Sequence, residues 1–381
     1  MDPMTHWEVL LDRPHATLRR RGRFVVADLH GPHRVISTSA RNGGQNEHVR
    51  HLVNHQSCEG AGHDARFRTI TEHGQEAYHD AVCREIDRSA EQSATMGTAA
   101  NMSYASVVTL ADGPVEVTTA VTAGVESNAT CAGDPAQWRE SPGKIEKVPH
   151  VAGTINTIVL VSVPVTPAAL ARMVLTMAEA KSAALHRLAA PSCYSSDLAT
   201  GTGTDQYCVA APLEGPPPLT SASPHMKLGE ILGAAVRDAT LEALRWQNGL
   251  EPSYTRGVFH ALGRYGLREA TFFDEMSGRL APADFELLRR NSKAALYEPL
   301  VGAAAHALAA VLDRVRHGTL PASVARDATV QHAATLAANL AARPERWPEF
   351  RARLHATPDE GPKALALAAI ALGWQEKWRS A

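Results

Sequence analysis

The feature that most constrains the fold is a change of character near residue 250 of the 381-residue chain. Before it, short apolar runs alternate with loops rich in Gly, Ser, Thr and Asn, a pattern typical of strands with interspersed helices. After it, long stretches rich in Ala and Leu are separated by Gly and Pro. We therefore expect an α/β (α+β) core with a mixed sheet over residues 1–250, followed by an all-α domain of unknown role over residues 251–381.

Within the first part, the sequence predicts both strands and helices. The Asp112-Gly113 turn indicates a hairpin over residues 104–124, and Thr166 followed by Pro167 indicates the capped start of a helix over residues 166–190. A second helix is expected over residues 226–247, and two runs of the first 40 residues are expected to pair across His30-Gly31-Pro32. The predicted strands are residues 23–29, 33–39, 154–163 and 205–212, and the later predicted helices are 281–318, 323–343 and 361–378.

Composition excludes several classes of protein. A net charge of −2 gives no electrostatic case for binding nucleic acid or an anionic membrane. The most apolar run, residues 155–165, is too short to span a bilayer and is β-branched, so we expect no membrane span. Five cysteines without a CxxC pair argue against a disulfide framework or a structural zinc site. These features, with an N-terminus unlike a secretory signal, favour the cytoplasm.

Two polar loops could carry chemistry. Residues 122–135 offer Glu126 as a general base or acid and Asn128 as a donor to an oxyanion, although the same residues also suit a plain turn. Residues 198–206 offer hydroxyls, glycines that permit close backbone approach, and Asp205. A phosphate cradle is disfavoured there because no Lys follows the glycines and no helix opens.

A third polar segment, residues 223–230, begins a predicted helix and carries His225 and Lys227. The positive end of a helix dipole keeps a His neutral, which a general base requires. The alternative is a solvated first turn. Separately, His48, His51 and His55 would share one face of a helix and could hold a metal, although a plain polar face is the commoner reason for such spacing.

Six segments of the first part are informative when they are taken together. They are "ISTSARNGG" (36–44), "TAGVESNATCAGDP" (122–135), "GTINTIVLVS" (153–162), "AEAKSAAL" (178–185), "ATGTGTDQ" (199–206) and "HMKLGEILGAAV" (225–236). In this order and spacing they resemble the adenosylcobinamide amidohydrolase family of corrinoid salvage. The resemblance runs from about residue 18 to residue 248 and leaves the helical part uncovered. It implies hydrolysis of the amide that links a corrin-ring propionate to aminopropanol in (adenosyl)cobinamide, giving adenosylcobyric acid.

Amide hydrolysis needs a base, oxyanion donors and an acid for the departing amine, and the polar segments supply candidates for each. We expect the catalytic residues to be Glu126, Asn128, Asp205 and His225. We expect substrate-binding residues lining a broad polar pocket, namely Asn42, Gly43, Gly44, Asn156, Thr200, Gly201, Thr202, Gly203, Thr204 and Lys227.

Several alternatives stay open at this point. Cys131 could be a nucleophile, although without a neighbouring His it is more often inert. A metal route through Asp and His ligands is a further option, but the sequence indicates no required metal or cofactor; the cobalt-containing corrinoid is the substrate. The chain could instead hydrolyse another amide or amidine, or bind a corrinoid or tetrapyrrole without catalysis. The C-terminal helices could mediate homo-oligomerisation or bind a protein partner.

Overall fold

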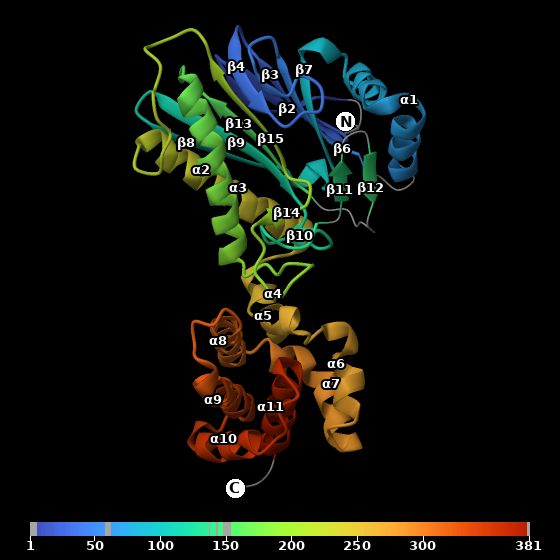
Figure 1. Cartoon of the computed structure of the whole chain (residues 1–381), viewed down its shortest axis with the longest axis vertical. Helices are drawn as coiled ribbons and strands as arrows, with labels where there is room; N and C mark the ends of the chain where they lie inside the picture. The colour runs from blue at the N-terminus through green and yellow to red at the C-terminus, as the bar shows by residue number, and fades with distance from the viewer. Residues whose placement is uncertain (1–5, 58–61, 137, 142–143, 148–153, 379–381) are drawn as a thin grey trace. The chain divides into compact units, whose positions relative to one another are not determined.

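A computed structural model describes residues 6–57, 62–136, 138–141, 144–147 and 154–378 (Figure 1). The chain divides into two compact units. We call Met1–Tyr194 with Leu198–Gly249 the mixed unit, and Ser195–Asp197 with Leu250–Ala381 the helical unit. The predicted fold class, a core with a mixed sheet followed by helices, is confirmed.

The mixed unit contains two main sheets. The first has the strand order β1-β2-β3-β6-β7 and is antiparallel except between β6 and β7. The second has the order β5-β4-β15-β13-β9-β8, and only β13 and β15 are parallel. The strands are β1 (Glu8–Arg13), β2 (Ala16–Arg21), β3 (Phe24–Leu29), β4 (His33–Ser37), β5 (Gly44–Asn46), β6 (His51–Gln56), β7 (Ser93–Thr98), β8 (Ser106–Asp112), β9 (Val115–Ala123), β13 (Ile155–Val161) and β15 (Gln206–Pro212).

Three apolar clusters order these elements into layers. Residues of both sheets, such as Leu52 and Ile158, meet in one core between the sheets. On the other side of the second sheet, alternate residues such as Val159 pack against α2 (Pro167–Arg187) and α3 (Lys227–Asn248). On the outer side of the first sheet, Val53 packs with residues of α1 (Gly62–Glu85). Successive strand residues therefore point to different layers.

Local sequence signals explain several of these elements. Every residue of β13 is buried because both of its faces are covered, which accounts for its continuous apolar composition. The Thr166 hydroxyl accepts a hydrogen bond from the Ala169 N–H at 3.2 Å, and Pro167 occupies the first turn of α2. In the hairpin of β8 and β9, Asp112 pairs with Val115. The predicted hairpin, the strands at 154–163 and 205–212, and the two helices are confirmed.

Two predictions about the first 56 residues are wrong. β3 and β4 do not pair with each other, because the chain passes from the first sheet to the second at Gly31, whose φ of +78° favours glycine. Residues 48–55 do not form a helix either. His51–Gln56 is the strand β6, and its pairing with β3 and β7 overrides the spacing of the histidines.

The remaining small elements of the mixed unit are two-stranded sheets and one-turn helices. β10 (Ala129–Thr130) pairs with β14 (Gly201–Thr202), and β11 (Trp138–Ser141) pairs with β12 (Lys144–Lys147). Short 3₁₀ turns, η1 (Ala90–Gln92) and η2 (Met102–Tyr104), flank β7.

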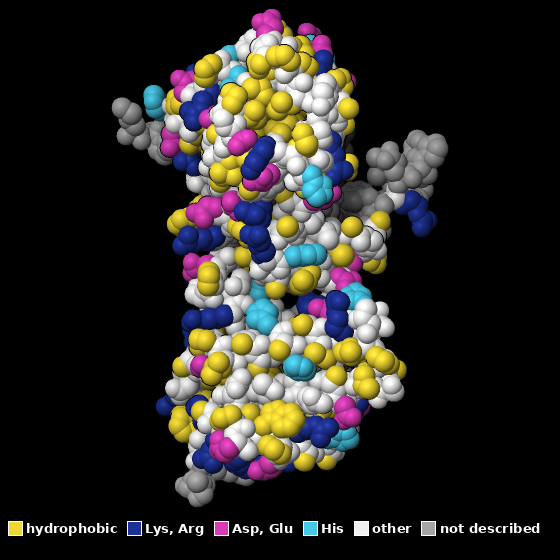
Figure 2. All heavy atoms as spheres, turned by 90° about the vertical axis from the view of Figure 1, so that its left-hand side faces the viewer, with side chains coloured by type: hydrophobic (Ala, Val, Ile, Leu, Met, Phe, Trp, Pro, Cys, Tyr) yellow, Lys and Arg dark blue, Asp and Glu magenta, His cyan; other side chains and the backbone are white. Residues whose placement is uncertain are grey.

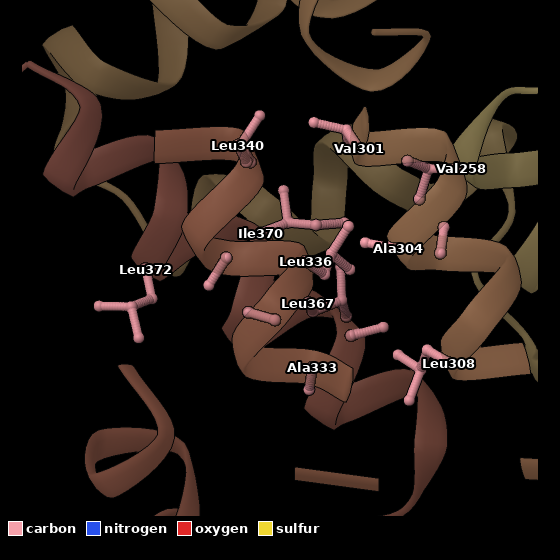
Figure 3. Packing of buried hydrophobic residues seen from close by; sticks show 14 of the residues in the cluster. Val258, Val301, Ala304, Leu308, Ala333, Leu336, Leu340, Leu367, Ile370 and Leu372 are labelled. Atoms are coloured by element: carbon pink, nitrogen blue, oxygen red, sulfur yellow. The ribbon is translucent and has the colours of Figure 1, made fainter. Parts of the chain in front are cut away.

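The helical unit has a core of its own around α9 (Ala322–Ala341). Its residues Ala333, Leu336 and Leu340 lie against α8 (Pro299–Arg316) and α11 (Pro362–Lys377), as Figure 3 shows. The predicted helix over 281–318 is two helices, because Pro299 begins α8 after a break at Tyr297 and Glu298. The other helices are α4 (Pro252–Thr255), α5 (Val258–Leu262), α6 (Glu269–Ser277), α7 (Pro282–Leu296) and α10 (Trp347–His355), with the short turns η3 (Gly263–Tyr265) and η4 (Pro344–Arg346).

No single helix among the described residues is both long and apolar enough to cross a bilayer; α7 and α8 reach those criteria only when joined, and they are bent by 81°. On the face shown in Figure 2, Lys and Arg side chains are interspersed with Asp and Glu.

Candidate active site

The candidate site lies at one edge of the second sheet, where β9 ends and where β13 and β15 begin. The register places Asn156 of β13 beside Thr122 of β9 and Gln206 of β15. The polar loops around Glu126 and Asp205 continue from the same strand ends. A rigid sheet therefore positions both loops at one edge.

Backbone hydrogen bonds join these two predicted loops. Ala129 pairs with Thr202 and Thr130 with Gly201 across β10 and β14. The Gly203 N–H extends this ladder and donates to the Asn128 carbonyl at 3.2 Å. The structure thus brings together the segments 122–135 and 198–206, which are about 70 residues apart in sequence.

Asp205 is the most heavily hydrogen-bonded carboxylate of this edge. It accepts hydrogen bonds from the Ile155 N–H at 3.0 Å, the Thr202 N–H at 3.0 Å and the Thr202 hydroxyl at 2.5 Å. The Lys181 ammonium forms an ion pair with its second oxygen, and each of the two side chains is only 18% exposed. Four donors occupy the carboxylate, so Asp205 is built to fix Lys181 and the loop rather than to take a proton.

Gly201 is required beside this ion pair. A Cβ at position 201 would collide with the Asp205 carboxylate and lie 2.8 Å from the Lys181 Nζ. The carboxylate is fixed by the backbone of two strands, so it cannot move aside. The absence of a side chain at Gly201 thus lets the Asp205 and Lys181 side chains approach the backbone closely, as expected for a glycine in this loop.

Asn128 and Asp134 hold the neighbouring loop in place. The Asn128 amide is fully buried, and its oxygen accepts a hydrogen bond from the Tyr194 hydroxyl at 2.8 Å. Asp134 accepts hydrogen bonds from the Ser192 hydroxyl at 2.6 Å and the Cys131 N–H at 2.7 Å. Burial raises the pKa of Tyr194, so its hydroxyl stays protonated at neutral pH.

A buried polar layer lies on the other face of the same strand ends, between the two sheets. The Asn54 amide donates to the Thr122 hydroxyl at 2.8 Å, and the Asn156 amide donates to the Asn54 oxygen at 2.9 Å. Within the part of the chain that the structure describes, the Oδ1 of Asn156 is buried and accepts no hydrogen bond. An unsatisfied buried acceptor costs about 1–3 kcal/mol, so this layer is maintained at a cost in stability.

The other predicted binding residues have varied positions. Asn42 is a turn residue with φ of 57°, and its amide donates to the Ala90 and Ser93 carbonyls at 2.9 and 2.8 Å. Gly43 packs against the Ser39 backbone, and Gly44 has φ of +72°. These three residues shape a loop, and the Asn42 amide is already engaged. Among the threonines, Thr202 binds Asp205, Thr204 contacts the Thr154 hydroxyl, and Thr200 accepts from the Ala132 N–H at 2.9 Å.

His225 and Lys227 do not join this edge. They lie at the start of α3, whose other end reaches the edge through the Asn248 oxygen, which accepts from the Val125 N–H at 3.1 Å. The 22 residues of α3 span about 33 Å, at about 1.5 Å per residue. His225 therefore cannot act with Glu126, and Lys227 instead pairs with Glu230 at 2.8 Å. The prediction that three polar segments meet in one cleft is wrong for the third.

Sequence reasoning left Lys181, Ser192, Asp134 and Tyr194 out of the predicted site. Two positions apart on α2, Glu179 and Lys181 lie on different faces, which does not tell which of them faces inward; the structure pairs Lys181 with Asp205 at the sheet edge. Among the described residues, no group of three His, Cys, Asp or Glu side chains is arranged to hold a metal ion. His51 instead binds Asp28 at 2.8 Å, and His55 lies 3.1 Å from the Tyr78 hydroxyl.

Comparison with known proteins gives two matches. The model of the protein family described as adenosylcobinamide amidohydrolase matches residues 10–252. The chain is also similar to an uncharacterized protein of Methanocaldococcus jannaschii, with 31% identity over 188 residues that cover 47% of this chain and 73% of the relative. The family match includes the edge described above and leaves the helices α5 to α11 outside.

Proposed function

The chain belongs to the adenosylcobinamide amidohydrolase family, and on that premise we propose that it hydrolyses the aminopropanol amide of (adenosyl)cobinamide. The products would be adenosylcobyric acid and 1-amino-2-propanol, and the acid would return to cobalamin synthesis as corrinoid salvage. The family name indicates an amidohydrolase, so the broad reaction class follows from membership. The particular substrate is our proposal.

The Lys181–Asp205 ion pair beneath the joined loops is the observation that carries this proposal. An unactivated amide needs about 8 kcal/mol or more of transition-state stabilisation. Much of that stabilisation comes from fixed positive groups placed where the carbonyl oxygen becomes negative. Lys181 is such a group, because Asp205 holds it in place and keeps its charge compensated before substrate binds.

Glu126 is our proposed base. It is exposed on the loop that precedes β10, and no described residue donates a hydrogen bond to its carboxylate. Asp205 cannot take this role while four donors occupy it. A carboxylate without such a donor is suited to removing a proton from water.

Tyr194 is our proposed acid for the departing amine. Burial keeps its hydroxyl protonated, and Asn128 orients it. As the water oxygen bonds to the carbonyl carbon, Glu126 takes one water proton and the carbonyl oxygen becomes an oxyanion next to Lys181. When the C–N bond breaks, Tyr194 gives a proton to the nitrogen. The proton held by Glu126 then passes through solvent to restore Tyr194, so one water is consumed per acid and amine released.

Mass spectrometry tests the proposal directly. Purified protein is incubated with adenosylcobinamide, and adenosylcobyric acid and 1-amino-2-propanol are measured over time. We expect both products in equal amounts. A bound corrinoid without product would instead support a non-catalytic corrinoid-binding protein, and turnover of other amides alone would support a related hydrolase.

A matched pair of lysine variants tests the site. Lys181→Met removes the fixed cation and should lower kcat by about 10²- to 10³-fold. Lys227→Met removes an exposed lysine at the far end of α3 and should leave kcat within about twofold, as expected for a surface substitution. Equal activity of the two variants would place the reaction elsewhere.

A further inference from the structure

A hollow of about 300 Å³ opens beside the candidate site, on the opposite face of β15. Its walls come from α1, β6, β7, the loop before β5 and the first residue of β15, and they include Arg41, His55, Tyr78, Gly97 and Gln206. Gln206 follows Asp205 directly, and successive strand side chains point to opposite faces. Neighbouring residues of the chain, Asp205 and Gln206, therefore face the ion pair with Lys181 and the hollow, respectively.

The basic groups of this hollow are already engaged, and its acidic side chain, Glu76, forms no ion pair with a described residue. The Arg41 guanidinium binds the Asp80 carboxylate at 2.5 Å, so it is not an unpaired cation. His79 is engaged at both ring nitrogens, by Thr95 at 3.0 Å and by the Ala90 carbonyl at 2.9 Å, and burial lowers its pKa. A phosphate or carboxylate would need an uncompensated cation, so these walls favour an uncharged ligand.

The shape and polarity of the walls favour a flat ligand with hydrogen-bond acceptors. The half-buried Tyr78 ring lies 5.7 Å from the buried His55 ring and offers a surface for stacking. Gly97 also lines the hollow, and a Cβ there would come into van der Waals contact with the His55 ring, at 3.4 Å. The Gln206 oxygen accepts the Gly97 N–H at 3.0 Å, which turns the Gln206 NH₂ group outward as a donor without an acceptor among the described residues. A nucleobase has this combination of planarity, neutrality and acceptor nitrogens.

We propose that the hollow binds the nucleoside part of the substrate, the adenosyl group, with the Gln206 amide as a donor to the adenine ring. The proposal rests on the proposed function, because that substrate carries one such group. A corrinoid whose amide lies at Lys181 would extend its adenosyl group around the strand end into the hollow. The hollow would then distinguish adenosylated from non-adenosylated corrinoids.

Calorimetric titration of the full chain with 5′-deoxyadenosine tests the binding step without any corrinoid. The wild-type chain should bind it. Gln206→Glu keeps the acceptor for the Gly97 N–H but removes the donor, and should weaken binding about tenfold or more. Gln45→Glu is the matched control, because it adds the same charge at an exposed position of β5 in the same sheet, and its affinity should equal that of the wild type. Absence of binding to the wild type, or equal affinity of Gln206→Glu and the wild type, would overturn the proposal.

Hydrolysis rates give a second, separate readout. We expect kcat/KM to be higher for adenosylcobinamide than for cyanocobinamide. Gln206→Glu should reduce the ratio of these two kcat/KM values about tenfold, while the kcat/KM for cyanocobinamide changes less than twofold. Gly97→Ala adds one methyl group to the wall of the hollow and should also lower the ratio of kcat/KM for adenosylcobinamide to kcat/KM for cyanocobinamide. If 5′-deoxyadenosine binds but neither corrinoid is hydrolysed, the proposed function fails and the nucleoside site stands. If both corrinoids are hydrolysed with equal kcat/KM, the nucleoside site fails and the proposed function stands.

Discussion

The two units of the molecule treat buried polar groups in different ways. The mixed unit buries the amides of Asn54, Asn128 and Asn156 at one edge of its sheets, and one of these amides retains an acceptor without a partner. In the helical unit, Glu376 is 1% exposed, and Arg346 and Arg353 bind both of its oxygens. Its core is otherwise built mainly from Ala and Leu. The Oδ1 of Asn156, unsatisfied among the described residues, lies at the sheet edge that carries the candidate site, so in the mixed unit a polar group that costs stability coincides with the proposed chemistry.

The sharpest way to break this comparison is to remove the proposed base. Glu126→Gln should lower kcat by about 10²- to 10⁴-fold, since the amide cannot take a proton from water. His225→Ala should stay within about twofold of the wild type, because His225 lies at the far end of α3. The measurement is steady-state release of 1-amino-2-propanol. Near-parental turnover by Glu126→Gln would assign the base to another residue.

A second test removes the buried carboxylate of the helical unit, which should lower stability and leave activity unchanged. Glu376→Ala removes the buried carboxylate that Arg346 and Arg353 bind at 2.7 and 2.8 Å and leaves a cavity in its place, and should lower the melting temperature of the helical transition by about 5–10 °C. kcat should not change. Glu349→Ala is a suitable control, because that carboxylate binds Arg346 at the surface. Calorimetry with activity assays on the same samples separates the two effects.

The stability of the two units should also respond differently to acid pH. Burial lowers the pKa of His33 in the mixed unit to about 4, below its ordinary value of 6.5. The unfolded chain therefore binds more protons between these values, and stability falls as the pH decreases from about 6.5 to 4, by at most about 3 kcal/mol. In the helical unit, the ion pair with Arg264 and the hydrogen bond from the Tyr265 hydroxyl lower the pKa of the Asp313 carboxyl despite its burial. The stability that Asp313 contributes therefore persists down to about pH 4.

Urea unfolding of the full chain at pH 7.5 and pH 5 is the measurement for this difference. Tryptophan fluorescence together with far-UV circular dichroism follows the transitions. The mixed unit should unfold at lower urea at pH 5, and His33→Gln should reduce that change. Equal sensitivity of both transitions would contradict the assignment to His33.

The smallest expected effects come from a Gly→Ala substitution in each unit, one lowering activity and the other lowering stability. Gly201→Ala places a methyl group against Asp205 and Lys181, and should lower kcat/KM about tenfold through displacement of the ion pair. Gly373→Ala places one 2.5 Å from the Ala337 carbonyl, where α11 crosses α9, and should destabilise the helical unit by about 1–3 kcal/mol. Gly373→Ala should leave kcat/KM unchanged. A loss of activity in Gly373→Ala larger than in Gly201→Ala would reverse the comparison.

Much of the fold could be predicted from local patterns, and the exceptions have physical causes. Thr166 with Pro167, and Asp112 with Gly113, are local signals, and the elements they predict are present. The histidines at 48, 51 and 55 have helical spacing, but β6 is set by its pairing with β3 and β7, which no local pattern contains. Similarly, the neighbours of β3 and β4 depend on a sheet change at Gly31.

The candidate site was predictable only where a loop adjoins a strand end. Loop 122–135 follows one predicted strand, loop 198–206 precedes another, and the two loops meet through β10 and β14. His225 precedes a helix that was also predicted correctly, but the sequence does not show which end of that helix reaches the loops. Lys181 was ambiguous for a related reason, because the inward face of α2 depends on the sheet beneath it.

Isotope incorporation tests the central claim, that the edge around Lys181 and Asp205 hydrolyses an amide, most directly. The reaction is run with adenosylcobinamide in ¹⁸O-labelled water, and the adenosylcobyric acid is analysed by mass spectrometry. The account predicts one ¹⁸O in the new carboxyl group for the wild type and a rate reduced about 10²- to 10³-fold in Lys181→Met. Unlabelled acid, or labelled acid formed equally fast by Lys181→Met, would contradict it.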